Sequence, residues 1–560
     1  MNLRWLFCFV LLGITPAWAL DLSPLESLAV QDGGRRKPLD TFARESLQKL
    51  AGRATWKDDT GRRWTGLEVL ASLQWGQKDW QKELLLRCNY LPLKQTLQLP
   101  ADRQFFSFQE LSNNLALSRI IDDIAQRRAH TEAKVELNRL ENEAETLYGK
   151  LEFFSALEKG TALRLIPPPP QSGSTWFSVS HAGRAHPDQA QTITNLYQAI
   201  GTAYRAGDDT ALSQAAQQFQ TQIRALSPSL YPPAKSLHLE LLYNHSHPFR
   251  WAWIFYALSF LVMLFAIRES GVGRRFYWPA MGLFLIGFAL QVYGFTLRSL
   301  ISGRPPVTNM YEVVLWTGFG AVFFAFIFEL IHRSRFLVLA ASAVGVVSLV
   351  LADNLPNVLN PSIQPLVPVL RSNYWLTIHV LTITLGYAAF FLALGIGHIV
   401  MGYYVFKPAE RRKTKELTHF NYRTMQIGVI FLTAGTILGG VWANYSWGRF
   451  WGWDPKETWA LIALLCYLIV LHGRYSGWMG DFALNVASVL CFQAIVMAAY
   501  GVNYVLGKGL HSYGFGTGGE WAVACYVGAE LVLVGLAVWR YKGLQASLTS
   551  APPSGDATPA

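Results

Sequence analysis

The feature that most constrains the fold of this chain is a series of apolar stretches that begins after His247-Pro248 and recurs toward the C-terminus. Each stretch has roughly the 20 residues that an α-helix needs to cross a bilayer. Only 15% of the 560 residues are charged and 51% are hydrophobic, which fits a chain that lies largely in lipid. The pattern predicts an α-helical polytopic membrane protein with about nine transmembrane helices. We place these spans near 250–268, 277–297, 310–331, 336–352, 374–406, 424–443, 457–472, 482–501 and 521–540.

The N-terminal part of the chain has the features of an exported segment. Arg4 precedes a short apolar run, and Ala17-Trp-Ala19 has the A-x-A form of a signal-peptidase site. We expect a signal peptide over residues 1–20, with an uncleaved signal anchor as the alternative. Residues 21–247 are polar, and their charged stretches have the apolar spacing of amphipathic helices. They predict a mostly helical exported domain.

The positive charges indicate how the spans are oriented. If the first span enters from outside, the inner segments carry 14 Lys or Arg and the short outer loops carry six, as the positive-inside rule requires. We therefore expect a bacterial inner (plasma) membrane protein with a periplasmic domain over 21–247. The transmembrane region would cover 248–543, and residues 544–560 would form a disordered cytoplasmic tail. The net charge of +11 does not indicate nucleic acid, because the basic residues lie in short clusters between apolar runs.

Residues 444–459 form a tryptophan-rich segment between the sixth and seventh spans, on the expected outer side. It includes WGRFWGWDPKETW, with four tryptophans among thirteen residues. Tryptophan collects at membrane interfaces, which alone could explain the rings. Their density, together with Gly448 and Gly452, which permit close backbone approach, favours a large planar ligand. Asp454 before Pro455 has the form of a helix N-cap, and an acid–base role for this carboxylate stays open beside it.

Two histidines fall on the same expected side of the membrane. His379 lies just inside the outer end of the fifth span, and His511 lies in the loop before the last span. Singly, they could be a hydrogen-bonded helix histidine and a solvated loop residue. An ionisable group within a span is, however, a functional-site hypothesis by default, and histidine is an axial ligand of haem iron. With the tryptophan-rich segment they predict a six-coordinate haem.

Three motifs carry a family resemblance. WGRFWGWDPKETW resembles the WWD segment of haem-handling proteins, and NYWLTIHV and GVNYVLGKGLHSYG resemble the two outer histidine segments of the CcsA (ResC) type of System II cytochrome c synthase. GRPPVTNMYE, at 303–312, also resembles a stretch that such proteins carry before a span. This resemblance covers most of 250–540. A shorter stretch, LAVQDGGRRKPLDTFAR at 28–44, is similar to part of fused or extended versions of the same synthases.

The resemblance implies a cytochrome c haem lyase (holocytochrome c synthase) that moves haem to the outer face and joins it to the CxxCH motif of apocytochrome c. Haem b would be its substrate, held non-covalently in transit. His379 and His511 would be the external axial ligands, and His472 would match the membrane histidine that binds haem iron earlier. Asp454 is the third catalytic candidate after the two outer histidines. The expected haem contacts are Trp447, Trp451 and Trp453.

One part of the family's haem pathway has no clear counterpart in this chain. In fused synthases a second membrane histidine comes from a partner half, and we expect no group of spans before residue 250 here. A separate CcsB-type membrane partner is the preferred source, with His398 or His332 as alternatives. The haem propionates would favour Arg or Lys near the outer face. The candidates by topology alone, each of which could be an ordinary loop charge, are Arg298, Arg304, Arg371, Arg449 and Lys456.

Three other functions stay open at the level of sequence. The first is a System I type haem-handling protein, against which the spacing of the two histidines and the NMYE stretch argue. The second is a proton-coupled small-solute transporter, although we see no internal repeat of the kind such transporters often have. The third is a scaffold that docks apocytochrome through residues 21–247.

Overall fold

A computed structural model describes residues 20–130, 135–267, 271–356, 358–366, 372–506 and 519–549. The predicted signal segment and most of the predicted tail lie outside these residues. The chain divides into two compact units, Met1–Asn244 and His245–Ala560.

The first unit is mostly helical and has its own apolar core, which includes Phe42, Trp80, Phe154 and Phe219. The described part also contains four short two-stranded antiparallel sheets that the sequence analysis did not predict. They pair β1 (Ala29–Asp32) with β2 (Arg35–Pro38), β3 (Thr55–Lys57) with β4 (Arg63–Thr65), β5 (Leu86–Arg87) with β6 (Phe105–Phe106), and β7 (Arg164–Ile166) with β8 (Phe177–Ser178). The helices are α1 (Ser23–Glu26), α2 (Leu39–Ala51), α3 (Gly66–Trp75), α4 (Leu91–Thr96), α5 (Phe108–Ser112), α6 (Leu115–His130), α7 (Arg139–Glu158), η1 (Val179–His181), α8 (Ala182–Ala185), η2 (Pro187–Gln189), α9 (Ala190–Ala206), α10 (Asp209–Leu226) and α11 (Ala234–Ser246).

The stretch 28–44 folds as the first hairpin and the start of α2. Its turn places Gly33 at φ 56° and Gly34 at φ 78°, left-handed values that a two-residue hairpin turn of this kind requires at both positions. The buried ammonium of Lys37 then pairs with Asp32 at 2.7 Å and with Glu45 at 2.5 Å. These residues therefore stabilise the fold of the first unit.

The described residues contain nine helices that are long and apolar enough to cross a membrane, which confirms the predicted fold class. Their bounds follow the predicted spans closely at most ends. The sixth, however, begins at Arg411 rather than near 424, because the polar residues before the apolar stretch include good helix formers. The last continues through Thr549, so the prediction of a disordered tail from residue 544 is wrong for residues 544–549, which are helical.

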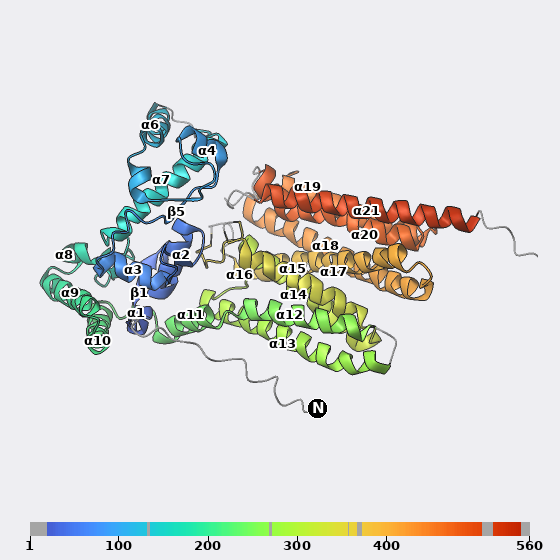
Figure 1. Cartoon of the computed structure of the whole chain (residues 1–560), viewed down its shortest axis with the longest axis horizontal. Coiled ribbons are helices and arrows are strands. Elements are labelled where there is room, and N and C mark those ends of the chain that lie inside the picture. The colour runs from blue at the N-terminus through green and yellow to red at the C-terminus, as the bar shows by residue number, and fades with distance from the viewer. Residues whose placement is uncertain are drawn as a thin grey trace, which may run out of the picture. The chain divides into compact units, whose positions relative to one another are not determined.

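The helices of the second unit run side by side as a bundle, coloured green to red in Figure 1. α17 packs against α14, α15, α18, α20 and α21. A Cβ on Gly386 of α17 would lie 2.8 Å from the backbone nitrogen of Leu432 on α18, so the close packing of these helices requires glycine there. The elements are α12 (Pro248–Ala266), α13 (Gly271–Ser302), α14 (Met310–His332), α15 (Phe336–Asn354), α16 (Asn373–Trp375), η4 (Leu376–Val380), α17 (Leu381–Phe406), α18 (Arg411–Trp447), α19 (Pro455–Tyr475), α20 (Asp481–Val496), η5 (Met497–Leu506) and α21 (Glu520–Thr549).

Two of these elements are π-helical. η4 precedes α17 in the fifth span, and η5 follows α20 in the eighth. Segments of π-helix are rare and occur frequently at functional sites, because the wider turn redirects side chains relative to the α-helix around them. Both π-helical segments contribute to the same cavity.

Candidate functional site

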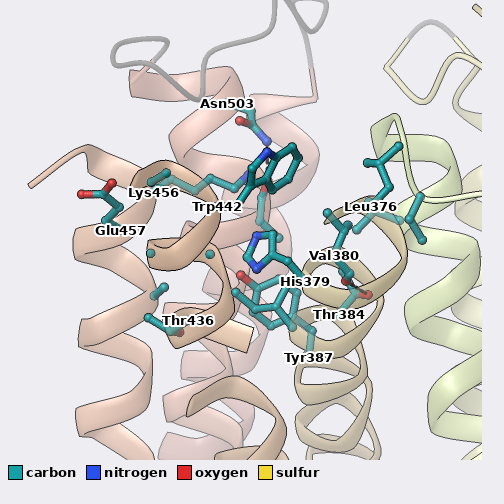
Figure 2. Close-up of a pocket in the computed structure, with 18 of the residues that line it drawn as sticks. Leu376, His379, Val380, Thr384, Tyr387, Thr436, Trp442, Lys456, Glu457 and Asn503 are labelled. Carbon is teal, nitrogen blue, oxygen red and sulfur yellow. Dashed lines mark hydrogen bonds between the residues drawn. The ribbon is translucent and has the colours of Figure 1, made fainter. Parts of the chain in front are cut away.

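The second unit contains a cavity of about 170 Å³ at one end of the bundle (Figure 2). Its walls come from η4 and α17, from α18 with the tryptophan-rich segment, from α19, from η5, and from the chain at 307–313. The lining is predominantly apolar, with a few polar side chains on different walls, and this composition is typical of a ligand pocket.

His379 lies in the wall formed by η4. Its Nδ1 is 2.8 Å from the carbonyl oxygen of Gly435, so Nδ1 carries the proton and donates it, and Nε2 is the nitrogen that can bind a metal. The ring rests against α18 at Gly439, where a Cβ would lie 2.6 Å from the Cε1 of His379. The fold thus sets both the tautomer and the position of this imidazole.

Aromatic rings form the wall beside His379. Trp442 lies edge to face with the imidazole, with ring centroids 5.7 Å apart, and stacks on Trp375 at 6.3 Å. Trp447 and Trp451, two of the predicted haem contacts, also line the cavity. Trp453 does not line it: this residue is 70% exposed and has a left-handed φ of 57°.

Asp454 caps the N-terminus of α19. It is buried, and its Oδ1 accepts a hydrogen bond from the backbone N–H of Lys456 at 2.9 Å. Glu457 completes a capping box by accepting from the backbone N–H groups of Gly452 at 2.8 Å and Asp454 at 3.2 Å. The structure therefore contains the cap that the sequence indicated, and it holds the end of the tryptophan-rich segment against α19.

The motif at 303–312 forms another wall. Thr308 and Asn309 line the cavity, and Asn309 caps α14 by accepting from the N–H of Glu312. Glu312 also accepts from the N–H and the hydroxyl of Thr308 and from the Nε of Arg298, each at 2.7 Å. The side chains of Arg298 and Glu312 are 0% and 1% exposed. A fully buried ion pair thus holds this wall in place.

The other predicted histidines lie apart from the cavity or outside the described residues. His472 is near the far end of α19, exposed, with its Nδ1 donating to the carbonyl of Leu468 at 2.7 Å. His398 has its Nε2 2.8 Å from a carboxylate oxygen of Glu530, and His332 packs on a phenylalanine ring. His511 lies outside the described residues, as does Arg371.

Several lining residues were not selected by the sequence analysis. Trp442, Phe450 and Asn503 all face the cavity, and Lys456 was only one of five cations considered for the outer side. Trp442 lies five residues before the tryptophan-rich run and could have been included with it. Asn503 offered the signal of an amide within an apolar span. Its place in the lining of the cavity depends on the π-helical segment η5, which no periodicity in the sequence indicated.

Comparison with known proteins identifies relatives of this region. The model of a family described as cytochrome C assembly protein matches residues 307–511. Cytochrome c biogenesis protein CcsA from Chlorella vulgaris is 32% identical over 300 residues, which are 46% of this chain and 94% of that protein. CcsA from Synechococcus sp. (strain CC9902) is 36% identical over 250 residues, or 39% of this chain and 81% of that protein.

Two further similarities extend over more of the chain. Protein NrfI from Wolinella succinogenes is 28% identical over 505 residues, which cover 86% of this chain but 53% of NrfI, so the chain spans about half the length of that relative. Among solved structures, Cytochrome c Heme Lyase CcmF is similar over 54% of this chain and 51% of that chain, with 17% identity and a TM-score of 0.37. At that TM-score the likeness does not establish a shared fold.

Proposed function

The chain belongs to the CcsA-type family of cytochrome c biogenesis proteins, and on that premise we propose that it delivers haem b across a bacterial inner membrane and attaches it covalently to apocytochrome c. The proposal makes the chain a haem lyase of the System II kind, with the first unit and the tryptophan-rich segment on the periplasmic side.

The observation that carries the proposal is the placement of His379 in an aromatic-walled cavity with Nδ1 bound to a backbone carbonyl. This arrangement presents a neutral imidazole nitrogen, the ligand that haem iron takes from histidine, beside rings that suit a flat tetrapyrrole. In the proposal His511 supplies the second axial nitrogen, and Trp447 and Trp451 contact the macrocycle. Trp453, because it is exposed at the rim, would contact haem only from outside the described cavity.

The attachment step requires no nucleophile from this chain. Each thiol of the CxxCH motif adds across a haem vinyl group: a carbon–sulfur bond forms, the thiol proton ends on the other vinyl carbon, and no group leaves. The step is redox-neutral overall. The protein's contribution is to hold the vinyl groups where the thiols can reach them and to exclude competing reactions.

The position of His472 favours a membrane haem site that is shared with a partner subunit. It is exposed on α19, where a second ligand could approach from another subunit. His398 is a poorer second ligand, because its Nε2 is already engaged by Glu530 at 2.8 Å. We therefore propose that a CcsB-type subunit supplies the second histidine of a membrane haem site at His472.

The proposal is tested by expressing the chain, with and without a candidate CcsB-type partner, in cells that lack any cytochrome c maturation system but export a CxxCH reporter. Covalent haem on the reporter in the presence of the partner is the expected result. Persistent absence of covalent haem with the partner present would contradict the proposal. A purified complex without a haem Soret band would favour the solute-transporter alternative.

Replacing the axial histidines tests the outer site separately. His379→Ala and His511→Ala should each lower the amount of haem that co-purifies and abolish maturation of the reporter, because each removes one iron ligand. His419→Ala serves as the matched control, since that imidazole is exposed, packs on the ring of Phe420 and does not line the cavity. If both outer variants kept the wild-type spectrum and activity, the assignment of the outer ligands would be wrong.

A further inference from the structure

We propose that Lys456 binds a carboxylate of the ligand in this cavity, which for haem is a propionate. This inference rests on the proposed function and adds to it the residue that sets the orientation of haem in the cavity. Nothing in the sequence distinguished Lys456 from four other cations on the expected outer side.

The first support is the position of Lys456. It lines the cavity from the first turn of α19, and it is the one Lys or Arg among the described lining residues. Figure 2 shows its side chain extending toward Trp442 and Asn503, whereas Glu457, the next residue, points the opposite way. Both residues line the cavity, but the ammonium extends toward Trp442 and Asn503 (Figure 2), whereas the carboxylate of Glu457 accepts hydrogen bonds from the backbone N–H groups of Gly452 and Asp454.

The second support is that nearby cations are already engaged by protein groups. Arg298 pairs with Glu312 at 2.7 Å, and Arg449 lies 3.6 Å from Glu457. Arg304 donates to the hydroxyl of Thr308 and to a backbone carbonyl. Within the described part of the chain, the ammonium of Lys456 forms no hydrogen bond or ion pair of its own; the carboxylate of Asp454 acts on it electrostatically and accepts a hydrogen bond from the backbone N–H of Lys456 at the start of α19.

An ammonium in a half-buried apolar cavity is unfavourable unless an anion or water compensates it. A carboxylate ligand would supply that compensation through a charge-assisted hydrogen bond. Lysine suits this role, because its compact charge on a flexible stem can follow a carboxylate that is itself on a flexible chain.

The consequence concerns the orientation of haem. Iron protoporphyrin carries its two propionates on one edge and its vinyl groups away from that edge. With the iron held at His379 and a propionate held at Lys456, rotation of the macrocycle about the iron–imidazole axis is restricted. The vinyl groups then lie away from Lys456, so this residue would decide which edge of haem meets the thiols of the substrate.

The experiment is a binding cycle with two probes, iron protoporphyrin IX and its dimethyl ester, in which both propionates are neutral. Each is titrated into the purified full-length chain, and binding is followed by the Soret band. The variants are Lys456→Met, which keeps the stem, Lys456→Arg, which keeps the charge, and the control Lys407→Met, which makes the same chemical change at an exposed position outside the cavity.

The wild type and the Lys407→Met control should bind the free acid on the order of tenfold more tightly than the ester, as expected for one charge-assisted hydrogen bond. Lys456→Met should lose that preference while its affinity for the ester stays the same, and Lys456→Arg should keep most of the preference. A Lys456→Met variant that still preferred the free acid to the full extent would overturn the inference and leave the proposed function intact. If the wild type bound neither probe through iron ligation, the proposed function itself would fail, and the inference with it.

Discussion

The position of one imidazole depends on a single glycine. The ring of His379 lies so close to α18 that any side chain at Gly439 would occupy its place, since a Cβ there would be 2.6 Å from Cε1 and 3.1 Å from Nδ1. The hydrogen bond to Gly435 and the edge of Trp442 hold the ring from two other directions. The proposed iron ligand is therefore preorganised by neighbouring residues that hold its ring in place.

Gly439→Ala should displace the imidazole and alter the Soret band of co-purified haem, or lower its amount, with little change in the thermal stability of the protein. Gly402→Ala on α17 is the matched control, because a Cβ at that position would have no heavy atom within 4 Å. Absorption spectra of the two purified variants make the comparison. An unchanged spectrum in Gly439→Ala would mean that haem ligation does not depend on the observed position of His379.

A second prediction at this scale concerns the buried pair of Arg298 and Glu312. Glu312→Ala would leave the guanidinium buried without its carboxylate partner, which costs about 3–5 kcal/mol. Asp353→Ala, which breaks the partly exposed pair with Arg250 at 3.0 Å, should cost at most about 1 kcal/mol. Chemical or thermal unfolding in detergent gives both values. The double variant Arg298→Met, Glu312→Met should recover part of the loss, and equal costs for the two single variants would contradict the argument.

At the scale of elements, the start of α19 joins the tryptophan-rich segment to the bundle. The carboxylates of Asp454 and Glu457 accept from backbone N–H groups at the helix start and at the end of the segment, and Pro455 at the first helical position has no N–H to satisfy. The same residues could have been read as an acid–base pair. The capping geometry gives a way to separate the two roles, because asparagine caps a helix as well as aspartate does but cannot act as an acid or base.

Asp454→Asn should therefore retain both haem binding and reporter maturation, whereas Asp454→Ala should lose about 1 kcal/mol of stability and lower haem occupancy by loosening the segment. Co-purified haem and the rate of covalent attachment are measured for both variants. Loss of attachment in Asp454→Asn with haem occupancy unchanged would show that the carboxylate takes part in the chemistry.

At the scale of the whole molecule, the two units have separate apolar cores, which predicts that the two units unfold separately. The first-unit core contains only residues of that unit, and a second core joins helices of the bundle. The full-length protein in detergent should therefore unfold in at least two steps.

Asp58 offers a probe of the first unit. Hydrogen bonds from the side chains of Thr60, at 2.6 Å, and Trp64, at 2.8 Å, lower the pKa of Asp58 from its ordinary 3.8 to about 2.

Because its pKa is lower in the folded state, Asp58 contributes stability above its ordinary pKa and loses that contribution as the pH falls toward 2. Asp58→Asn should therefore lower the first-unit transition temperature at pH 7 and leave the other transition unchanged. As the pH falls from about 4 to about 2, the wild type should approach the variant. Calorimetric scans across this range provide the test. A shift that was the same at every pH, or a single transition in all scans, would contradict the prediction.

The sequence by itself determined the membrane fold and several local features of the cavity wall. Stretches of about 20 apolar residues allow few structures other than spanning helices, because an unpaired backbone polar group in lipid is too costly. Local signals were likewise sufficient for the cap at Asp454 and for the placement of His379 near a helix end. The WWD and histidine motifs were sufficient to identify the family, since they could be read without knowing which helices pack together.

Only the tertiary structure decided which residues share the cavity. The neighbours of His379 come from α18, α19 and η5, which are far from it in sequence, and two π-helical segments that no hydrophobic periodicity revealed turn the side chains inward. Helix packing also gives different surroundings to cations that were equivalent in the sequence: Arg298 is buried against Glu312, whereas Lys456 lines the cavity. The physical reason is that pairing and burial depend on distances between helices, whereas charge and hydropathy along the chain reveal only where a helix can cross the membrane.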